Sequence, residues 1–205
     1  MRGRRADRLR HDEGHRARDR HRTHLAAREV RGQERRVAPS RHRVAVRAAI
    51  ITVSTSKSEA GGEGDESGAR LAEFAAELGA EIAGREVVAD DRALIAERLR
   101  HWVDDENCDV VLTTGGTGVA PTDVTPEATC DVIEREAPGI AEAMRAASRE
   151  HTPHWMLSRG VAGIRGRTLI VNFPGSPRSI DQAGAAIADA LPHALELLAG
   201  RHGGH

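Results

Sequence analysis

Two spacings of hydrophobic residues alternate along most of this chain. Short apolar runs rich in β-branched side chains are typical of buried strands, and they occupy residues 44–53, 81–88, 109–112 and 168–173. Elsewhere apolar side chains recur every three or four positions, which predicts helices over residues 68–78, 92–104, 126–136, 140–150 and 177–198. Strands that alternate with amphipathic helices predict an α/β fold of three αβα layers, with helices on both faces of a mostly parallel sheet.

Glycine and proline mark the expected limits of several elements. Pro192 is expected to kink or split the last helix, because proline lacks the backbone N–H that a helix interior needs. The Pro138-Gly139 pair is expected to separate two helices. Residues 151–155 are expected to form a loop, and a short strand is predicted over residues 160–165. These breaks fall between the apolar segments, so they agree with the α/β pattern.

The composition is that of a chain with one folded domain. Of its 205 residues 39% are hydrophobic and only 2% are aromatic, so Ala, Val, Leu and Ile must supply the core. No apolar stretch approaches the roughly 18 residues of a membrane span, and the N-terminus lacks the apolar segment of a secretory signal. Cys108 and Cys130 do not have metal-ligand spacing, and two unpaired thiols favour a reducing compartment. We therefore expect a cytoplasmic protein with no membrane contact.

Charge divides the chain into two unlike parts. Residues 1–49 hold 16 Arg and 6 Asp/Glu, a net charge of +10, and the remainder holds 14 Lys/Arg and 25 Asp/Glu, a net charge of −11. Residues 1–44 show almost no apolar periodicity, so we expect a disordered Arg/His-rich tail before a folded domain over residues 45–201. A nucleic-acid-binding arm is disfavoured, because no aromatic side chain interleaves the charges to stack on bases. A third interpretation is that translation starts downstream of this tail.

One stretch combines a strand, a glycine-rich turn and the start of a helix. The apolar residues 110–112 lead into residues 113–118, Thr-Thr-Gly-Gly-Thr-Gly, and residues 125–127, Thr-Pro-Glu, open a helix. Glycines let a ligand approach the backbone, and free N–H groups, hydroxyls and a helix N-terminus suit a phosphate. The turn lacks the Gly-Lys-Ser/Thr of a P-loop and the G-x-G-x-x-G of a dinucleotide site. A ligand-free turn between strand and helix stays the alternative.

Further polar residues are expected at the same edge of the sheet. In open parallel sheets ligands bind beyond the carboxyl ends of the strands, where residues 54–56, Asp90, 114–123 and 174–177 would gather. Two turns rich in glycine and hydroxyls can hold two phosphate groups, and two aspartates can hold Mg²⁺. The sequence has no Cys/His set for zinc and no nucleophile elbow for acyl transfer. This edge therefore favours phosphoryl or nucleotidyl transfer.

The motifs at this edge resemble a known family. TTGGTG at residues 113–118, PTDVTPEAT at 121–129 and NFPGSP at 172–177 resemble the MoaB/Mog family of molybdenum cofactor biosynthesis, and the resemblance covers residues 46–199. It implies a molybdopterin adenylyltransferase, which converts molybdopterin and ATP to adenylyl-molybdopterin and pyrophosphate with the help of Mg²⁺. It also implies a homo-oligomer, a trimer or a hexamer, and other molybdenum cofactor biosynthesis proteins as partners.

The same resemblance assigns roles to individual residues. Pattern alone favours a helix cap for Asp90 or Asp91. The resemblance instead matches Asp90 and Asp123 with the family's two functional aspartates, which we expect to act in catalysis and to hold Mg²⁺. Lys57 stands where relatives often carry an acidic residue or Asn, which leaves the local substrate contacts open. The residues expected to bind the nucleotide and the pterin are Ser54, Asp65, Ser67, Gly68, Thr114, Gly115, Gly116, Thr117, Gly118, Ser158, Arg159, Pro174, Gly175 and Ser176.

A second class of function stays open from the sequence. The domain can bind molybdopterin without adenylating it, and so serve as a carrier or scaffold. The presence of both Asp90 and Asp123 favours the enzyme. Pyrophosphate release that depends on molybdopterin separates these two hypotheses, and removal of residues 1–44 tests the nucleic-acid interpretation.

Overall fold

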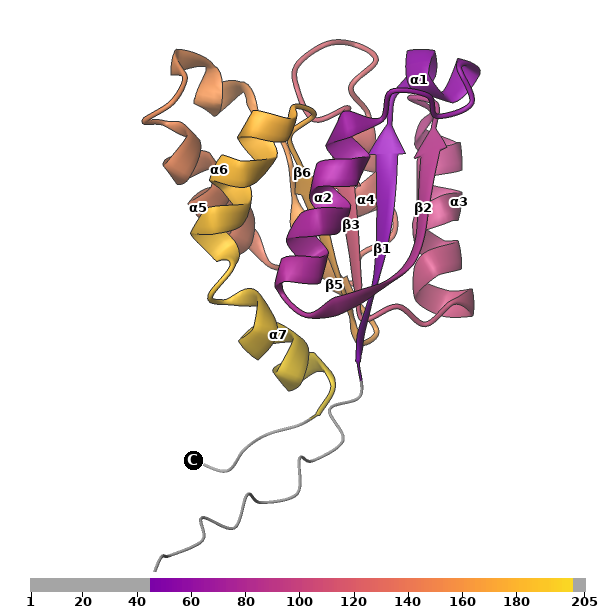
Figure 1. Cartoon of the computed structure of the whole chain (residues 1–205), viewed down its shortest axis with the longest axis vertical. Coiled ribbons are helices and arrows are strands. Elements are labelled where there is room, and N and C mark those ends of the chain that lie inside the picture. Colours follow the sequence, from indigo (N-terminus) through magenta and orange to yellow (C-terminus); the bar gives the residue numbers. More distant parts are fainter. Residues whose placement is uncertain (1–44, 201–205) are drawn as a thin grey trace, which may run out of the picture. The chain divides into compact units, whose positions relative to one another are not determined.

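The sheet has four parallel strands and an antiparallel extension on one side. The structure, a computed structural model, describes residues 45–200, which form the strands β1 (Val46–Val53), β2 (Ala80–Val88), β3 (Val110–Thr114), β4 (Arg135–Glu136), β5 (Ala162–Arg165) and β6 (Thr168–Phe173). They lie in the order β2-β1-β3-β6-β5-β4 (Figure 1). The first four of this order pair in parallel, and β5 and β4 follow in antiparallel pairs. The expected mostly parallel sheet is confirmed.

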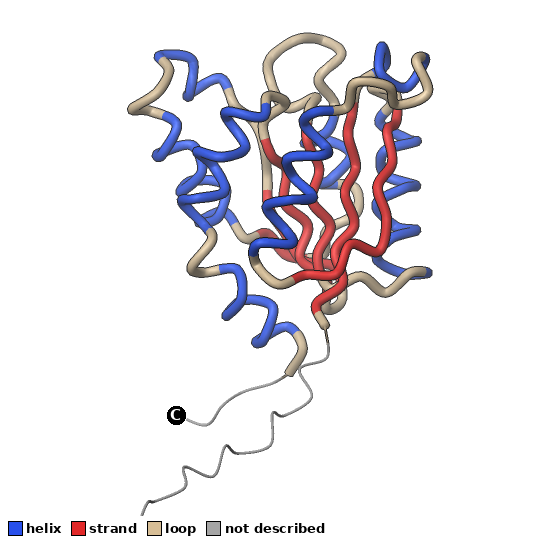
Figure 2. Tube along the Cα trace, in the orientation of Figure 1, coloured by secondary structure: helices blue, strands red, loops and turns tan. Residues whose placement is uncertain are grey.

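Helices cover both faces of the sheet. One face packs against α2 (Glu66–Glu77), α5 (Pro138–Ser148), α6 (Pro177–Ile187) and α7 (Leu191–Leu198), and the other against α3 (Arg92–Arg100), the π-helix η1 (His101–Asp105) and α4 (Thr125–Cys130) (Figures 1 and 2). Side chains of β1 alternate between these layers, since Ala48 and Ile50 join the first cluster and Ala49 and Ile51 the second. The three αβα layers predicted from the sequence are therefore present.

Two of the few aromatic side chains, Phe74 and Trp102, pack over glycines. The rings of Phe74 and Phe173 lie 5.5 Å apart, and a Cβ on Gly184 would come within 2.8 Å of the Phe74 ring. On the other face, a Cβ on Gly84 would come within 2.2 Å of the Trp102 ring. A core made mainly of small aliphatic side chains thus accommodates its large rings where the neighbouring residue has no side chain.

The helix predicted over residues 126–136 is wrong in its second half. Helix α4 ends at Cys130, and the chain then turns back to add β4 to the sheet. Val132 is 1% exposed, and the Glu134 N–H donates to the Ile164 carbonyl oxygen at 2.8 Å. Burial of this apolar segment and pairing with β5 therefore override the helical spacing of the sequence.

Smaller differences concern turns and prolines. The last helix splits as expected, but the break lies at residues 188–190, so that Pro192 falls in the first turn of α7, where a missing N–H is tolerated. Pro138 likewise begins α5. Residues within the expected loop over 151–155 contribute to the 3-10 helix η2 (Pro153–Leu157), and a short helix α1 (Thr55–Glu59) follows β1.

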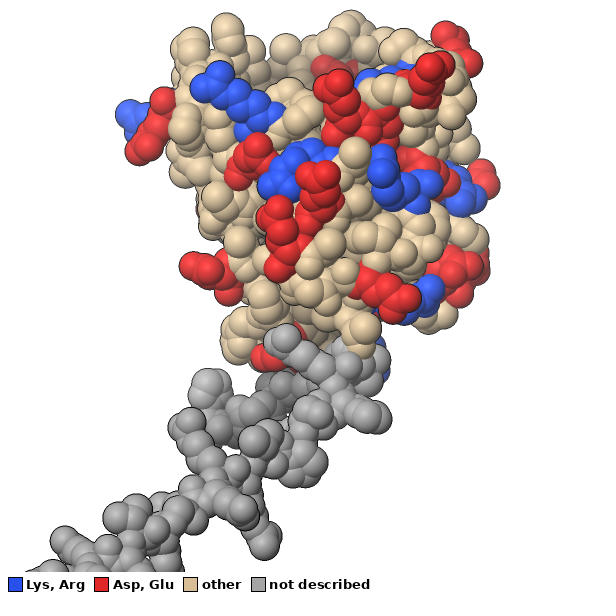
Figure 3. Space-filling view, in the orientation of Figure 1, with Lys and Arg blue, Asp and Glu red and all other residues tan. Residues whose placement is uncertain are grey.

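The described residues, 45–200, belong to one compact unit. None of their helices is both long and apolar enough to cross a membrane. Cationic and acidic side chains are interspersed on the face that carries α2 and α6, as in the pair of Arg70 with Glu77 at 3.0 Å (Figure 3). The expectations for residues 1–44, a disordered tail or a nucleic-acid arm, lie outside the residues that the structure describes.

Candidate active site

Three strands end side by side at one edge of the sheet, which we call the carboxyl edge. The register places Thr52 of β1 beside Thr114 of β3, and Thr114 beside Phe173 of β6. The loops that follow these strands therefore begin at the same level, and they emerge together beyond the sheet (Figure 2). Parallel pairing thus brings the predicted site residues of these loops to one edge.

Residues 115–118, the glycine loop, touch the loops of both neighbouring strands. Gly115 has a φ of +94°, and a Cβ there would lie 2.3 Å from the carbonyl oxygen of the last β1 residue. A Cβ on Gly175 would lie 3.3 Å from the Gly115 Cα atom. The Thr114 hydroxyl donates to the Pro174 carbonyl oxygen at 2.8 Å. The three loops therefore form one contiguous surface that depends on the glycine at position 115.

A chain of buried hydrogen bonds connects the glycine loop to α4 and β6. The Thr125 hydroxyl donates to the Gly115 carbonyl oxygen at 2.9 Å, and the Thr125 N–H donates to the Gly116 carbonyl oxygen at 3.1 Å. The Thr125 carbonyl accepts from the Thr129 hydroxyl, which in turn accepts from the Asn172 amide, each at 2.9 Å. This network was not predicted, because its members are polar residues within segments that read as core. It fixes the glycine loop to β6 and α4.

Asp90 lies against the glycine loop, whereas its neighbour Asp91 does not. Asp90 Oδ2 accepts from the backbone N–H and the hydroxyl of Thr55, at 2.8 and 2.9 Å. Its Oδ1 lies 3.3 Å from the position of a Cβ on Gly116. Asp91 caps α3 by accepting from the Leu94 N–H at 2.8 Å. The structure thus separates a helix cap from a carboxylate at the candidate site, and it adds Thr55 as the residue that orients that carboxylate.

Asp123 lies against the same loop, two residues further on. Its Oδ2 accepts from the Ala120 N–H at 2.8 Å and lies 2.8 Å from the position of a Cβ on Gly118. Asp90 and Asp123 therefore flank one glycine loop, at Gly116 and Gly118. Two carboxylates that converge on a loop of glycines and hydroxyls form a place where a cation and a phosphate can meet.

The donor set of this edge fits Mg²⁺ better than a transition metal. Within residues 45–200 no group of three or more His, Cys, Asp or Glu side chains is placed to hold a metal ion. Mg²⁺ does not need such a group, because it is usually held by one or two carboxylates together with waters and substrate phosphates. Asp90 and Asp123 supply two carboxylates of this kind.

Arg159 makes contacts with the protein rather than pointing into open space. Its Nε donates to the Gly118 carbonyl oxygen and its Nη2 to the Asp123 carbonyl oxygen, both at 2.6 Å. Its guanidinium also pairs with Glu127 of α4. A hydrogen bond from Arg159 holds the pKa of Glu127 below its ordinary value, and the same pair raises the pKa of Arg159. The pair therefore stays ionised at neutral pH.

The segment after β1 contains a buried carboxylate, which contacts both β1 and α2. Asp65, whose side chain is 7% exposed, caps α2 at the Gly68 N–H (2.9 Å) and accepts from the Thr52 hydroxyl at 3.0 Å. The Lys57 ammonium lies 4.0 Å from this carboxylate. The Ser67 hydroxyl donates to the Gly175 carbonyl oxygen at 2.7 Å, which ties α2 to the loop after β6. Ser54 begins α1 as its cap.

A hollow beside the loop after β6 collects the remaining predicted residues. This Ser158 hollow has a volume of about 160 Å³ and is lined by Ala141, Met144, Arg145, Ser148, Thr152, His154, Trp155, Ser158, Gly160, Asn172, Pro174, Ser179 and Ala183. Apolar side chains and hydroxyls both line it, a combination that suits a polar heterocycle. Ser176 caps α6 at the Ser179 N–H (3.2 Å) beside it. The hydroxyls of Ser148, Thr152 and Ser179 in this hollow were not predicted, because nothing in their local spacing marks them.

Residues 49–193 span all the loops of the carboxyl edge, and they match the family described as "Probable molybdopterin binding domain". The chain belongs to this family. The resemblance to MoaB/Mog proteins that the motifs indicated is thereby confirmed. The part of the chain that the family covers contains both aspartates and the glycine loop.

Individual relatives of the chain agree with this family membership. The molybdopterin adenylyltransferase of Helicobacter pylori J99 is 45% identical over 117 residues, which are 57% of this chain and 66% of that protein. That of Escherichia coli K12 is 41% identical over 126 residues, 56% of this chain and 65% of that protein. The chain thus spans slightly less than two thirds of these curated relatives. The structure of the molybdopterin biosynthesis enzyme MoaB of Thermus thermophilus is 46% identical, with a TM-score of 0.70 over 76% of this chain and 97% of that one.

Proposed function

We propose that this chain adenylates molybdopterin, using ATP, in molybdenum cofactor biosynthesis. The observation that carries the proposal is the placement of Asp90 and Asp123 against Gly116 and Gly118 of one glycine loop. A binding domain needs only contacts to its ligand, whereas two carboxylates beside a phosphate-type loop suit transfer of a nucleotidyl group. The curated relatives named molybdopterin adenylyltransferase support the same activity.

The reaction forms one phosphorus–oxygen bond and breaks another. An oxygen of the terminal phosphate of molybdopterin attacks the α-phosphorus of ATP, and the bond to the β-phosphate oxygen breaks, so that pyrophosphate leaves with the bonding electrons. The attacking group is already an anion, so no strong general base is required. Alignment of the two phosphates and neutralisation of their charge are therefore the main tasks of the site.

We assign these tasks to separate parts of the carboxyl edge. Residues 115–118 would receive the ATP phosphates, because their backbone and hydroxyls allow close approach. Asp90 and Asp123 would hold Mg²⁺, which when bound supplies positive charge to the phosphates. The Ser158 hollow would take the pterin ring, because both apolar side chains and hydroxyls line it, which suits a flat heterocycle with polar edges. Ser67 and Gly175, joined by a hydrogen bond, would contact the pterin phosphate.

The proposal also covers the compartment, the oligomeric state and the partners of the enzyme. We propose that it works in the cytoplasm as a homo-oligomer, a trimer or a hexamer, and that it receives molybdopterin from and delivers its product to other molybdenum cofactor biosynthesis proteins. Size-exclusion chromatography with light scattering measures the oligomeric state. A monomer at micromolar concentration would contradict this part of the proposal and leave the activity to be tested separately.

The test of the activity is pyrophosphate release from ATP and Mg²⁺, measured with and without molybdopterin. We expect release only when molybdopterin is present, and loss of release when Mg²⁺ is chelated and its return when Mg²⁺ is restored. Binding of molybdopterin without any release of pyrophosphate would contradict the enzyme and establish a carrier or scaffold instead.

A further inference from the structure

The segment that carries Asp123 has little structure of its own. Residues 119–123 form a turn, closed by the Asp123 N–H to the Ala120 carbonyl oxygen at 2.9 Å. Val119, within this turn, is 63% exposed, so the segment gains little from burial. Short exposed turns sample several conformations unless other contacts restrain them. Within the turn the Asp123 carboxylate accepts from the Ala120 N–H at 2.8 Å, so its position follows that of the turn, which depends on what holds the two ends of this segment.

Arg159 holds both ends. Its guanidinium donates to the Gly118 carbonyl oxygen at the start of the turn and to the Asp123 carbonyl oxygen at its end, both at 2.6 Å. The backbone N–H of Arg159 also donates to the Thr117 carbonyl oxygen at 2.9 Å. The pair with Glu127 on α4 fixes the guanidinium plane itself. One side chain thus ties the glycine loop, the turn and a helix together.

We infer that Arg159 is a positioning residue that sets the Asp123 carboxylate for catalysis, and that Glu127 is its partner. The inference rests on the proposed function and deepens it. All three guanidinium nitrogens of Arg159 donate to protein oxygens, so the side chain is engaged with the loop and not directed at a substrate anion. Glu127 acts through its ion pair with Arg159.

The geometry of the contacts explains why arginine is needed. Two carbonyl oxygens and a carboxylate must be reached at once, and the planar guanidinium offers its donors in fixed, divergent directions. A lysine ammonium is a single point charge and cannot bridge all three. Displacement of a catalytic carboxylate by about 1 Å can cost on the order of a hundredfold in rate. Loss of Arg159 should therefore lower the catalytic rate more than it weakens substrate binding.

The experiment compares Arg159→Gln, Arg159→Lys and Glu127→Gln with a matched control, Arg165→Gln. Arg165 forms a comparable set of contacts, a two-pronged pair with Asp104 and a donation to the Val132 carbonyl oxygen, but it lies on β5 away from the glycine loop. For each variant kcat and KM for ATP and molybdopterin are measured from pyrophosphate release. Amide hydrogen exchange of residues 117–123 is followed in parallel.

We expect kcat to fall by about tenfold to a hundredfold in Arg159→Gln, with KM for both substrates changed less than about threefold. Arg159→Lys should fail to restore kcat, and Glu127→Gln should lie between wild type and Arg159→Gln. Exchange of the amides in residues 117–123 should accelerate in Arg159→Gln. Arg165→Gln should leave kcat and this exchange at the wild-type level.

Three results would overturn the inference. An unchanged kcat in Arg159→Gln would show that the turn keeps its geometry without Arg159. A large rise in KM at constant kcat, with full rescue by lysine, would make Arg159 an anion-binding residue. Unchanged amide exchange of residues 117–123 in Arg159→Gln would show that Arg159 does not hold this turn. This result would refute the inference even if the wild type releases no pyrophosphate, an outcome that would separately refute the proposed function.

Discussion

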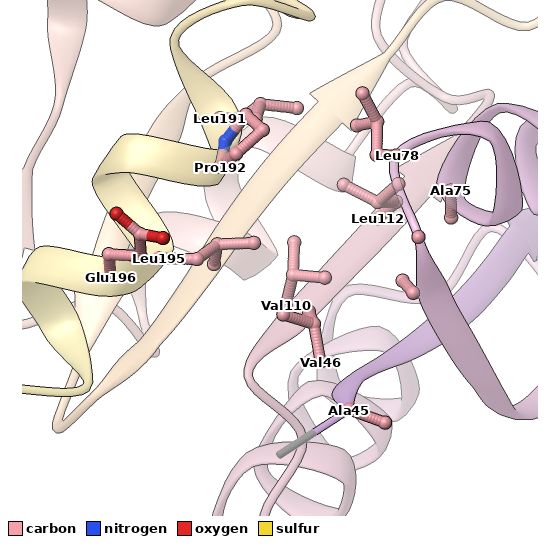
Figure 4. Close-up of a pocket in the computed structure, with 12 residues that line it drawn as sticks. Ala45, Val46, Ala75, Leu78, Val110, Leu112, Leu191, Pro192, Leu195 and Glu196 are labelled. Carbon is pink, nitrogen blue, oxygen red and sulfur yellow. The ribbon is translucent and has the colours of Figure 1, made fainter. Parts of the chain in front are cut away.

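The two edges of the sheet differ in chemistry although the same strands build both. At the carboxyl edge, loops of glycines, hydroxyls and two aspartates touch one another. At the opposite amino edge lies an apolar hollow of about 250 Å³, lined by Ala45, Val46, Ala75, Leu78, Gly79, Ala80, Val110, Leu112, Leu191, Pro192, Leu195 and Glu196. The side chains of Val110, Leu112 and Leu195 point into it (Figure 4). This apolar hollow therefore does not suit phosphate chemistry.

The difference between the edges shows that the topology of the sheet, and not the presence of a hollow, determines where the polar candidate site lies. In parallel β-α units each helix that returns along the sheet begins near the carboxyl end of a strand. Asp65 and Ser176, the caps of α2 and α6, accordingly lie at the carboxyl edge. Helix N-termini carry partial positive charge and unpaired N–H groups, which favour anions. The amino edge receives the C-terminus of α2, and its hollow is lined almost entirely by aliphatic side chains.

The largest predicted effect is at Asp123 of the carboxyl edge. Asp123→Ala should lower molybdopterin-dependent pyrophosphate release by at least about a hundredfold, because a carboxylate that neutralises and orients the reacting phosphates is lost. Asp91→Ala is the matched control, since Asp91 caps α3 next to the candidate site. It should cost about 1 kcal/mol of unfolding free energy and leave the rate unchanged. Equal rates of pyrophosphate release in Asp123→Ala and Asp91→Ala would contradict the assignment of Asp123, but not Asp91, to the reaction.

A second test removes the backbone freedom of the glycine loop. Gly115→Ala adds a Cβ 2.3 Å from a β1 carbonyl oxygen, at a φ of +94°, so the loops after β1 and β3 must move apart. We expect a loss of about 2–5 kcal/mol in unfolding free energy from urea denaturation, together with loss of activity. Gly139→Ala meets no atom within 4 Å and should be neutral or slightly stabilising. Full activity in Gly115→Ala would show that close contact of the loops is dispensable.

A third test addresses the amino edge. Leu191 is 2% exposed and lines the hollow at the amino edge, so Leu191→Ala should lower the unfolding free energy by about 2–5 kcal/mol. At a temperature where the variant remains folded, kcat for pyrophosphate release should equal that of wild type. A lower kcat in the folded variant would mean that the amino edge takes part in the reaction, and the separation of the two edges would be wrong.

The smallest predicted effect concerns acid stability, and it should be similar at both edges. Hydrogen bonds from Arg159 and Arg165 hold the pKa values of Glu127 and Asp104 below their ordinary values. A lowered carboxyl pKa stabilises the fold above the unfolded-state pKa near 4, and this stability is lost as pH falls through the folded-state pKa. Urea denaturation between about pH 6 and about pH 3 should therefore show a shallower acid loss in Glu127→Gln and Asp104→Asn. Only Glu127→Gln should also reduce activity.

The sequence predicted the layers and the candidate site where local pattern and global fold agree. The continuous apolar runs of β1 and β6 match buried parallel strands, and helical spacing located α2, α3 and α5 to within a few residues. The motif around residues 113–118 located the glycine loop, because its glycines have no role in a helix or strand. Parallel topology then placed the motifs at one edge without knowledge of any contact.

What could not be predicted depends on contacts between distant segments. The sequence of residues 126–136 has helical spacing, yet β4 forms because Val132 is buried and Glu134 pairs with β5. Likewise, nothing local distinguishes Asp90 from Asp91 until Thr55 and Gly116 are seen beside one of them. The hydrogen-bond chain from Asn172 to the glycine loop arises only when β6 and α4 meet. Such roles follow from tertiary packing and are invisible to periodicity.

The most direct measurement of the central claim follows the α-phosphate of ATP. Wild-type protein is incubated with Mg²⁺, molybdopterin and ATP labelled at the α-phosphorus, and the pterin product is separated and counted. The account predicts that the label appears in adenylyl-molybdopterin in equal amount to the pyrophosphate released, and that Asp123→Ala transfers none while still binding molybdopterin. Bound molybdopterin that never acquires the label in the wild type would contradict the claim that the carboxyl edge transfers a nucleotidyl group.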